Sequence, residues 1–420
     1  MRWIAALGVT QMIMTAWGAP DGEAPQLPSK RFESNVPIRA ITAGPRSHWF
    51  GYYDKLQFDP SGRYALGMAV EFDDRPNTPD DIIELGTIDI ENGDAWTPFA
   101  ETTAWCWQQG CMLQWIPGSA SEVIYNVREN GQYKAVIRDV FTGATRTIPS
   151  AIYAVSPDGK RAVCPNFARL GTTRPGYGYY GIADPFAAEL APENDGIYAI
   201  DLATSEVRLL FSVSQVAHFG MEFPAHEGKH WFNHLLFSPG GARFIFLHRW
   251  HHSVEKTATW HTRMLTAAPD GSDLRIVADH EMVSHFIWKD PAQILAWSRE
   301  PEKEDRFHLY DEASGESTVV GDGVLMRDGH CTYSPGKQWV LTDQYRDKDG
   351  MQPLMLYRPS DGRLEPLGKF YIPPSQTGEI RCDLHPRWSR DGKYVCIDSM
   401  HENNQRQIYL LDVSAIVGAE

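Results

Sequence analysis

The sequence repeats one short turn seven times, and this repeat restricts the possible folds more than any other feature. Each copy has an anchor residue that is usually aromatic, then a tight polar turn, then an apolar strand, as in "FSPGGARFIFLH" and "YSPGKQWVLTD". The seven anchors are Phe58, Trp115, Val155, Phe237, Trp288, Tyr333 and Trp388. They recur about every 40 to 57 residues, with one step of about 82, and a repeat of this length built from short strands is typical of a β-propeller.

One such repeat cannot cover both of its own faces, so neighbouring repeats supply the core and the ring closes on itself. Seven copies in 420 residues therefore predict an all-β fold, a seven-bladed β-propeller over residues 46–420. The one long step predicts an insertion at about residues 165–230. The 14 Trp, 17 Tyr and 18 Phe agree with many short strands. A β-sandwich, or several small β domains, is the structural alternative.

The N-terminus has the pattern of an export signal. One Arg precedes a mostly apolar run over residues 3–17, and "AWG" supplies the small residues that a signal peptidase requires. The run is too short to span a bilayer. We therefore expect a signal peptide over residues 1–18, a Pro-rich lead-in over residues 19–45, and a periplasmic or secreted protein without membrane insertion. The alternative is a buried N-terminal segment.

The net charge limits the partners that the chain can have. It is −15 at pH 7, and the sequence contains no basic cluster, so nucleic acid is not an expected partner. The same charge argues mildly against a polyanionic substrate. Local cations or a metal ion can nevertheless reverse the field inside a single cleft.

Four histidines occupy one position of the repeat, three residues before the anchor. They are His234, His285, His330 and His385 in the last four copies, whereas the first three copies carry Lys55, Met112 and Ile152. Only 15 of the 420 residues are His, so four in register are hard to attribute to chance. Equivalent positions of a propeller converge around its axis, and the four side chains should face one space. Alternatively, each His caps its own blade by a backbone hydrogen bond.

This arc of histidines has the chemistry of a metal site. Imidazole combined with thiolate or carboxylate suits Zn²⁺ or Mn²⁺. In "CDLHP", Cys382 precedes His385 by three residues, a spacing that can bring both side chains to one ion. The predicted metal ligands are His285, His330, Cys382 and His385, and the predicted cofactor is a divalent metal, zinc in preference to manganese or calcium. His234 is left as the free, reactive His.

A second group of polar residues lies in the expected insertion, in "NFARLGTTRPGYGYYG". A loop this rich in Arg and Tyr can clamp a carboxylate bidentately and bring a phenol to a substrate. It can equally pack as an ordered loop against the rim. Arg249, in "FLHRWHH", can face the same cleft, and ring closure would set "SHWFGYYDK" of the first blade beside the seventh.

With these motifs, the chain resembles the seven-bladed propeller polysaccharide lyases, namely oligogalacturonate lyase and, more loosely, the ulvan lyases. The resemblance is carried by "FNHLLFSPGG" and "CDLHPRWSRDG". In oligogalacturonate lyase a Gln-x-x-His-x-His group and a His from an earlier blade hold a divalent metal. Here Cys382 stands at the Gln position, His385 at the first His and Arg387 at the second. A Cys ligand favours zinc, which is largely structural in the ulvan lyases.

The resemblance implies β-elimination on a uronic acid within an anionic polysaccharide or oligosaccharide. A base removes the C5 proton beside the carboxylate, an acid protonates the departing oxygen at C4, and Arg or a metal stabilises the developing dianion. His234 is then the candidate base, Tyr179 the acid or partner base, and Arg174 and Arg249 the carboxylate clamps. The expected substrate-binding residues are Arg169, Tyr177, Tyr53 and His48.

Two other functions fit parts of the same pattern. A non-catalytic periplasmic scaffold would explain export, repeats and acidity, but not four histidines in register. A glycoside hydrolase needs two carboxylic acids beside the scissile bond, and Asp54 and Asp383 lie near the expected rim. The fold alone does not choose between them, because propellers host many functions.

Overall fold

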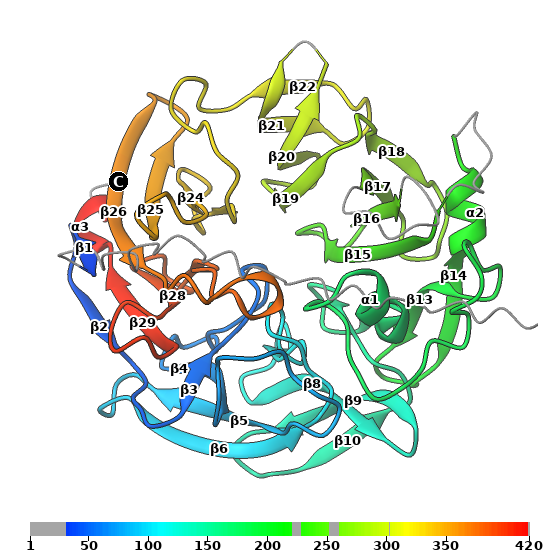
Figure 1. The fold of residues 1–420 in the computed structure, drawn as a ribbon. Helices are drawn as coiled ribbons and strands as arrows, with labels where there is room; N and C mark the ends of the chain where they lie inside the picture. Colours follow the sequence, from blue (N-terminus) through cyan, green and yellow to red (C-terminus); the bar gives the residue numbers. More distant parts are fainter. Residues whose placement is uncertain (1–30, 221–227, 252–259, 302, 419–420) are drawn as a thin grey trace, which may run out of the picture.

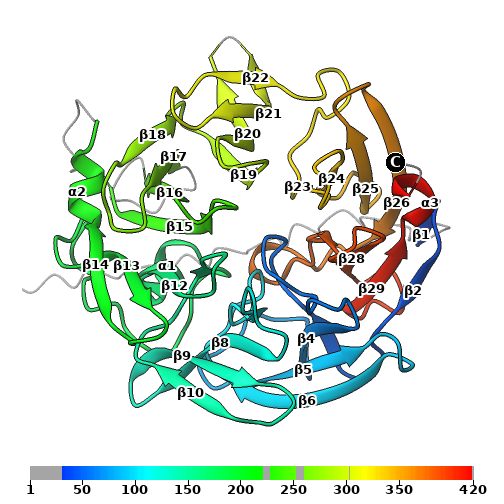
Figure 2. The same cartoon turned by 180° about the vertical axis from the view of Figure 1, so that it is seen from behind.

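The computed structural model describes residues 31–220, 228–251, 260–301 and 303–418. They form seven antiparallel sheets arranged as blades around a central axis (Figure 1, and from behind in Figure 2). The predicted all-β, seven-bladed propeller is thus confirmed. The described helices are α1 (Phe167–Thr173), α2 (Val213–His218), α3 (Ser414–Val417) and the 3-10 helix η1 (Gly378–Ile380). None of them is long and apolar enough to cross a membrane. The predicted signal peptide, residues 1–18, lies outside the described residues.

The first four blades follow one another along the chain, each with four strands. Blade 1 comprises β3 (Ser47–Trp49), β4 (Tyr64–Val70), β5 (Ile83–Asp89) and β6 (Ala95–Thr102). Blade 2 comprises β7 (Gln114–Trp115), β8 (Glu122–Glu129), β9 (Gln132–Asp139) and β10 (Thr145–Ile148). Blade 3 comprises β11 (Ala154–Val155), β12 (Arg161–Pro165), β13 (Gly196–Asp201) and β14 (Val207–Ser212). Blade 4 comprises β15 (His230–Phe237), β16 (Phe244–His251), β17 (Trp260–Ala267) and β18 (Arg275–Ala278).

The last three blades close the ring with help from the start of the described chain. Blade 5 comprises β19 (Val283–Trp288), β20 (Gln293–Glu300), β21 (Glu304–Asp311) and β22 (Ser317–Val319). Blade 6 comprises β23 (Thr332–Tyr333), β24 (Val340–Asp343), β25 (Met351–Arg358) and β26 (Arg363–Tyr371), with β1 (Phe32–Ser34) as a fifth strand. Blade 7 comprises β27 (Arg387–Trp388), β28 (Tyr394–Ser399) and β29 (Gln407–Asp412), and β2 (Ile38–Ala40) supplies its outer strand.

Two expected boundaries differ from the structure. The lead-in expected over residues 19–45 contributes β1 and β2 to the ring, so the propeller begins before residue 46. The insertion expected at 165–230 contains β13 and β14, which are regular strands of blade 3. The extra chain lies on either side of them, with α1 before β13 and α2 after β14. Sequence spacing alone cannot tell added chain from the blade strands between two additions.

The repeated turn explains the register of the blades. Each anchor pairs with the start of the next strand, as Phe237 pairs with Phe244 and Tyr333 with Val340. The Ser that often follows the anchor holds the turn, because the Ser334 hydroxyl accepts a hydrogen bond from the Trp339 backbone N–H at 3.1 Å. The seven anchors therefore mark equivalent places in seven blades.

The core lies between the blades. One apolar cluster joins Trp297 and Phe307 of blade 5 to Tyr333 and Met355 of blade 6. Another joins Phe58 of blade 1 to residues of blade 7, across the closure of the ring. All six cysteines are buried, and none of them forms a disulfide. Such packing holds the innermost strands, and hence the axis, in place.

Candidate metal centre and active site

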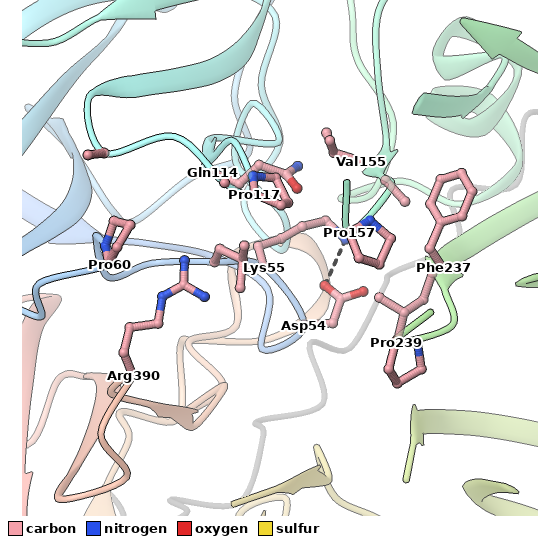
Figure 3. A pocket seen from close by; sticks show the side chains of 15 residues that line it. Asp54, Lys55, Pro60, Gln114, Pro117, Val155, Pro157, Phe237, Pro239 and Arg390 are labelled. Carbon is pink, nitrogen blue, oxygen red and sulfur yellow. Dashed lines mark hydrogen bonds and ion pairs between the residues drawn. The ribbon is translucent and has the colours of Figure 1, made fainter. Parts of the chain in front are cut away.

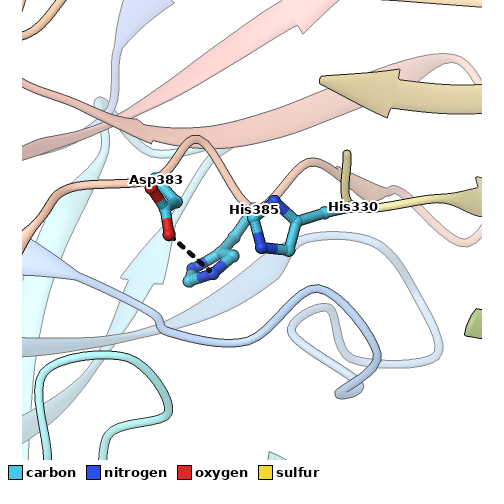
Figure 4. Close-up of side chains that lie close together, drawn as sticks. All are labelled: His330, Asp383 and His385. Carbon is cyan, nitrogen blue, oxygen red and sulfur yellow. Dashed lines mark ion pairs between the residues drawn. The ribbon is translucent and has the colours of Figure 1, made fainter. Parts of the chain in front are cut away.

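His330, Asp383 and His385 form a compact group at the axis (Figure 4). One ligand atom from each lies within 4.8 Å of the others, and the two imidazole rings are 4.3 Å apart. The Nε2 atoms of both histidines are buried and have no hydrogen-bond partner among the described residues. Buried polar atoms are normally satisfied, so these two nitrogens require a partner. Two imidazoles and a carboxylate suit a zinc or manganese ion, and the group therefore fits a divalent metal.

The repeat places these histidines, and also gives some of them an unusual backbone. His385 and His234 have φ values of +42° and +55°, in the left-handed region that non-glycine residues rarely adopt. Met112, at the same repeat position in blade 2, has a φ of +58°. This backbone therefore belongs to the geometry of the repeat, and is not by itself a sign of function.

Asp343, at the end of β24, orients His330. Its carboxylate lies 2.9 Å from His330 Nδ1 and accepts a hydrogen bond from the His330 backbone N–H at 2.7 Å. Burial lowers the pKa of His330, but the charge and hydrogen bond of Asp343, together with the charges of Asp383 and Asp328, outweigh it, and the net pKa is raised. A proton held on Nδ1 by Asp343 leaves Nε2 free for a metal, as in many histidine metal sites.

His285 lies beside this group without joining it. Its ring is 4.1 Å from that of His330, its Nδ1 is 2.9 Å from Asp328, and its Nε2 is 3.5 Å from the Tyr345 hydroxyl. Of the predicted ligands, the structure thus brings together His330 and His385, with His285 adjacent.

Asp383, and not the predicted ligand Cys382, lies with the two histidines. The Cys382 side chain packs in a small apolar cluster with Ile372 and Met400. Burial raises the pKa of its thiol to about 12, which disfavours the thiolate that a metal requires. Asp383 instead lies with the two histidines and accepts a hydrogen bond from Arg381 at 2.6 Å.

The predicted free histidine, His234, lies across the axis from the metal group, and Tyr52 connects the two. The Tyr52 ring stacks on His234 with centroids 5.0 Å apart, and it lies 5.1 Å from His385 and 6.0 Å from His330. Tyr52 stands in "SHWFGYYDK", but the sequence prediction selected its neighbour Tyr53. The loop preceding Phe58 therefore places the Tyr52 phenol between His234 and the metal group.

His234 is held as an unprotonated imidazole, the form that a general base requires. Its Nδ1 lies 3.4 Å from both the Tyr153 hydroxyl and the Gln109 amide nitrogen, which fix the ring. Burial, and then the positive charge of Arg249, lower the pKa of His234 well below 6.5. The imidazole is therefore neutral near pH 7 and able to accept a proton.

Two arginines beside His234 have spare hydrogen-bond donors. Arg249 donates to Thr262 Oγ1 at 3.1 Å and to the Val283 carbonyl at 3.3 Å, but its Nη1 has no partner among the described residues. Arg174 lies over the Tyr177 ring at 4.7 Å, and its buried Nε also lacks a partner there. Burial, and then the charge of Arg174, lower the pKa of Arg249 to about 10, so it remains a cation at neutral pH. Paired cations with free N–H groups favour a bound carboxylate.

Tyr177 also belongs to this side of the site. Its ring lies 5.4 Å from His234, and its hydroxyl accepts a hydrogen bond from Arg381 at 2.6 Å. Arg381 therefore bridges Tyr177 and Asp383, and so links the arginine side of the site to the metal side. Arg381 directly precedes "CDLHP", but nothing in the sequence singled it out.

Two of the predicted residues hold the fold instead of facing the site. The buried Arg169 guanidinium donates to four backbone carbonyls, including that of His230 at 2.7 Å, and pairs with Asp184 at 3.3 Å. Tyr179 stacks on Phe167 at 4.1 Å, and its hydroxyl accepts from Asn126 at 2.9 Å. Both order the Arg- and Tyr-rich loop, which is the packing role that was the alternative for this segment.

The two residues predicted from blade 1 are also engaged structurally. His48 Nδ1 lies 3.1 Å from Gln407 of blade 7, so His48 joins the two blades that close the ring. The Tyr53 hydroxyl accepts from the Phe286 N–H and donates to its carbonyl. The Tyr53 ring is still 5.3 Å from His330, so Tyr53 supports one wall of the site.

A separate pocket of about 700 Å³ opens at the mouth of the ring that carries the anchor turns (Figure 3). Prolines of four of those turns line it, and its floor holds a buried ion pair between Asp54 and Lys55, 2.8 Å apart. Asp383 does not line this pocket. Asp54 is paired with Lys55, whereas Asp383 is paired with Arg381. The two carboxylates considered for glycoside hydrolysis therefore do not face each other across this pocket.

The charge of the carboxylate that orients a histidine is expected to affect metal affinity at only one of the two His–Asp pairs. Asp343→Asn keeps the size of the side chain but removes the charge that holds His330, and should weaken metal binding by roughly 10- to 100-fold. Asp328→Asn makes the same change beside His285, which lies outside the three-ligand group, and should change affinity by less than about threefold. Competition titration with a chelating indicator measures both. Equal losses in the two variants would contradict this geometry.

No model of a known protein family matches this chain, and no curated protein sequence does. Its structure is similar to oligogalacturonate lyase in complex with manganese, with a TM-score of 0.63 and 15% identity over 90% of this chain and 93% of that chain. Oligogalacturonate lyase from Vibrio parahaemolyticus gives a TM-score of 0.63 and 14% identity, over 91% of this chain and 96% of that chain. A prolyl endopeptidase gives 0.52 and 11%, over 89% and 49%. At these identities the similarity shows the propeller fold alone, and it gives no support to a likeness to the ulvan lyases.

Proposed function

We propose that this chain is a metal-dependent polysaccharide lyase that cleaves a uronic-acid-containing polysaccharide or oligosaccharide by β-elimination. One observation carries the proposal. A neutral His and two arginines with spare donors face a His–Asp–His group across Tyr52, at the axis of the ring. A scaffold propeller has no need of a buried arginine such as Arg249, which has no acidic partner among the described residues, because burying an uncompensated charge is costly. The fold shared with the oligogalacturonate lyases adds support.

His330, Asp383 and His385 would hold the metal. When bound, a divalent cation neutralises the uronate carboxylate and so makes the adjacent C5 proton more acidic. The imidazole and carboxylate donors suit manganese as well as zinc, and the similar oligogalacturonate lyase was solved with manganese. This donor set therefore does not favour zinc over manganese, in contrast to the preference that a Cys ligand implied.

The side chains of the chain itself supply the proton transfers. Arg249 and Arg174 bind the substrate carboxylate and stabilise the charge that develops on it. Unprotonated His234 Nε2 takes the C5 proton, the electron pair of the C5–H bond forms the C4–C5 double bond, and the C4–O bond breaks. Burial raises the pKa of Tyr52 well above 10, so its phenol stays protonated and can give its proton to the departing oxygen.

Replacing His234 by Ala should lower kcat/KM by roughly 10²- to 10⁴-fold, the usual effect of losing a general base. The low pKa of His234 keeps its basic form present as the pH falls, so the acid limb of the wild-type profile should lie below pH 6.5. Initial rates across pH measure both. An unchanged rate in His234→Ala would exclude His234 as the base. An acid limb above pH 6.5 that persists at saturating metal would also exclude it, because excess metal keeps His330, whose pKa is raised, in its unprotonated form.

The proposed function is tested by near-ultraviolet absorbance on a panel of uronate polysaccharides, with a neutral glucan as the control substrate. Elimination creates a C4–C5 double bond conjugated to the carboxylate, which absorbs in this range, whereas hydrolysis does not. We expect absorbance to rise with at least one uronate polymer, to stop after chelation and to return with added manganese. Absorbance that rises equally after chelation would refute the metal requirement.

A further inference from the structure

A groove of about 990 Å³ lies along the outer part of blade 6, beside β25, β26 and β1. Four basic residues line it, Arg327, Arg346, Lys348 and Lys369, against two acidic ones, Glu33 and Asp347. The whole chain has a net charge of −15, so the charge of this groove is opposite in sign to that of the chain as a whole. A local excess of positive charge of this kind attracts anionic ligands.

The four cations of the groove form no ion pair in the described part of the chain, although Glu33 of β1 stands opposite Lys369 of β26. Arg327, Lys348 and Lys369 are exposed and form no side-chain hydrogen bond or ion pair within the described part of the chain. Arg346 donates only to the Pro373 and Pro374 carbonyls, at 3.4 and 3.3 Å. Their charges are therefore available to a ligand.

Two residues that line the groove are sequence neighbours of the aspartates beside the proposed metal centre. Arg327 directly precedes Asp328, whose carboxylate holds His285, and Gln344 directly follows Asp343, whose carboxylate holds His330. The chain before β23 and the loop after β24 leave blade 6 at the same face of the ring, because the two strands are antiparallel. Both segments therefore contribute to the site and to the groove.

We propose that this groove binds further uronate residues of the same acidic chain whose reactive residue lies at the axis. This inference rests on the proposed function and extends it, since it assigns polymers and long oligosaccharides as the preferred substrates. A uronate chain carries one carboxylate per acidic sugar, which matches a groove lined by several cations that form no ion pairs. Salt should weaken such binding, because it screens exposed charges.

The test compares a trisaccharide with a long uronate oligosaccharide as substrates. In the double variant Arg327→Glu with Lys348→Glu, we expect kcat/KM to fall at least about tenfold for the long substrate and to stay unchanged for the trisaccharide. Both side chains are exposed, so the fold should be kept. The matched control, Lys160→Glu with Lys393→Glu, makes the same change in charge on exposed lysines of blades 3 and 7, outside the groove.

A wild-type rate that does not depend on chain length, or an equal loss on both substrates, would overturn the groove and leave the proposed function standing. If no uronate is cleaved, the proposed function fails and affinity electrophoresis through a gel containing polygalacturonate decides the groove alone. Retardation of the wild type and control, lost in the groove variant, would support it. Equal migration of all three, corrected for a polymer-free gel, would overturn it.

Discussion

His330→Ala should lose the metal and the elimination activity together. His330 supplies one of only three donors in the group, and its Nε2 is buried without another partner among the described residues. Removing a residue that binds the metal directly should lower the affinity by more than the roughly 10- to 100-fold that follows loss of a residue orienting such a ligand. Elemental analysis after dialysis should fall from about one metal ion per chain to almost none, and initial rates should fall by more than about 100-fold.

The matched control is Cys382→Ser. The Cys382 thiol packs with Ile372 and Met400, away from the histidines, so this variant should keep the metal and its activity. His280→Ala, at an exposed His paired with Glu300, controls for loss of an unrelated imidazole. Metal retained in His330→Ala would refute the site. Metal lost in Cys382→Ser would restore the ligand set expected from the spacing of "CDLHP".

Arg387→Met should destabilise the fold by about 3–5 kcal/mol, because it leaves the buried Asp398 carboxylate without its cation. Arg387 donates to Asp398 at 2.8 Å, to Gln57 Oε1 at 2.8 Å and to the His385 carbonyl at 2.6 Å. Asp398 also accepts from the backbone N–H groups of Phe50 and Gly51, just before Tyr52. This one pair therefore supports two walls of the site. Urea unfolding at neutral pH measures the loss.

Two further variants separate the buried charge from other effects of the substitution. Adding Asp398→Asn to Arg387→Met removes the unpaired charge and keeps an amide acceptor, so part of the stability should return. Arg299→Met breaks an exposed pair with Asp305 and should cost less than about 1 kcal/mol. A loss in Arg387→Met as small as in Arg299→Met would show that the buried pair contributes little.

Arg387 also explains how this chain departs from the oligogalacturonate lyase pattern. It stands where the resemblance places a second metal-binding His, but its guanidinium turns to Asp398 and supports His385 through the backbone. Asp383 then joins the group from within the same segment. The position at which the resemblance places a second metal-binding His therefore carries a residue that supports the fold of this chain.

The ring and its arc of histidines could be predicted because residues at the same position of each repeat occupy equivalent positions in the blades once the ring closes. The seven anchors required only counting, and they mark equivalent turns in the structure. His330 and His385 meet at the axis for the same reason. Positions set by the repeat were therefore accessible from the sequence.

Positions outside regular strands were not accessible in this way. The segment that carries Cys382 and Asp383 precedes β27 and has no strand alternation, so spacing could not say which side chain faces the axis. Tyr52 and Tyr179 lie on irregular chain, and packing sends the first to the site and the second into the core. The Asp343–His330 pair joins the end of β24 to the chain just before β23 and depends on the register of these two strands.

The most direct test of the proposed reaction is the mass of the products formed from a defined uronate oligosaccharide. We predict two fragments whose masses add up to that of the substrate, one of them carrying a double bond, formed only by the metal-loaded protein. Fragments that together gain one water would show hydrolysis and contradict elimination. No cleavage of any uronate chain by the metal-loaded protein would contradict the proposed function altogether.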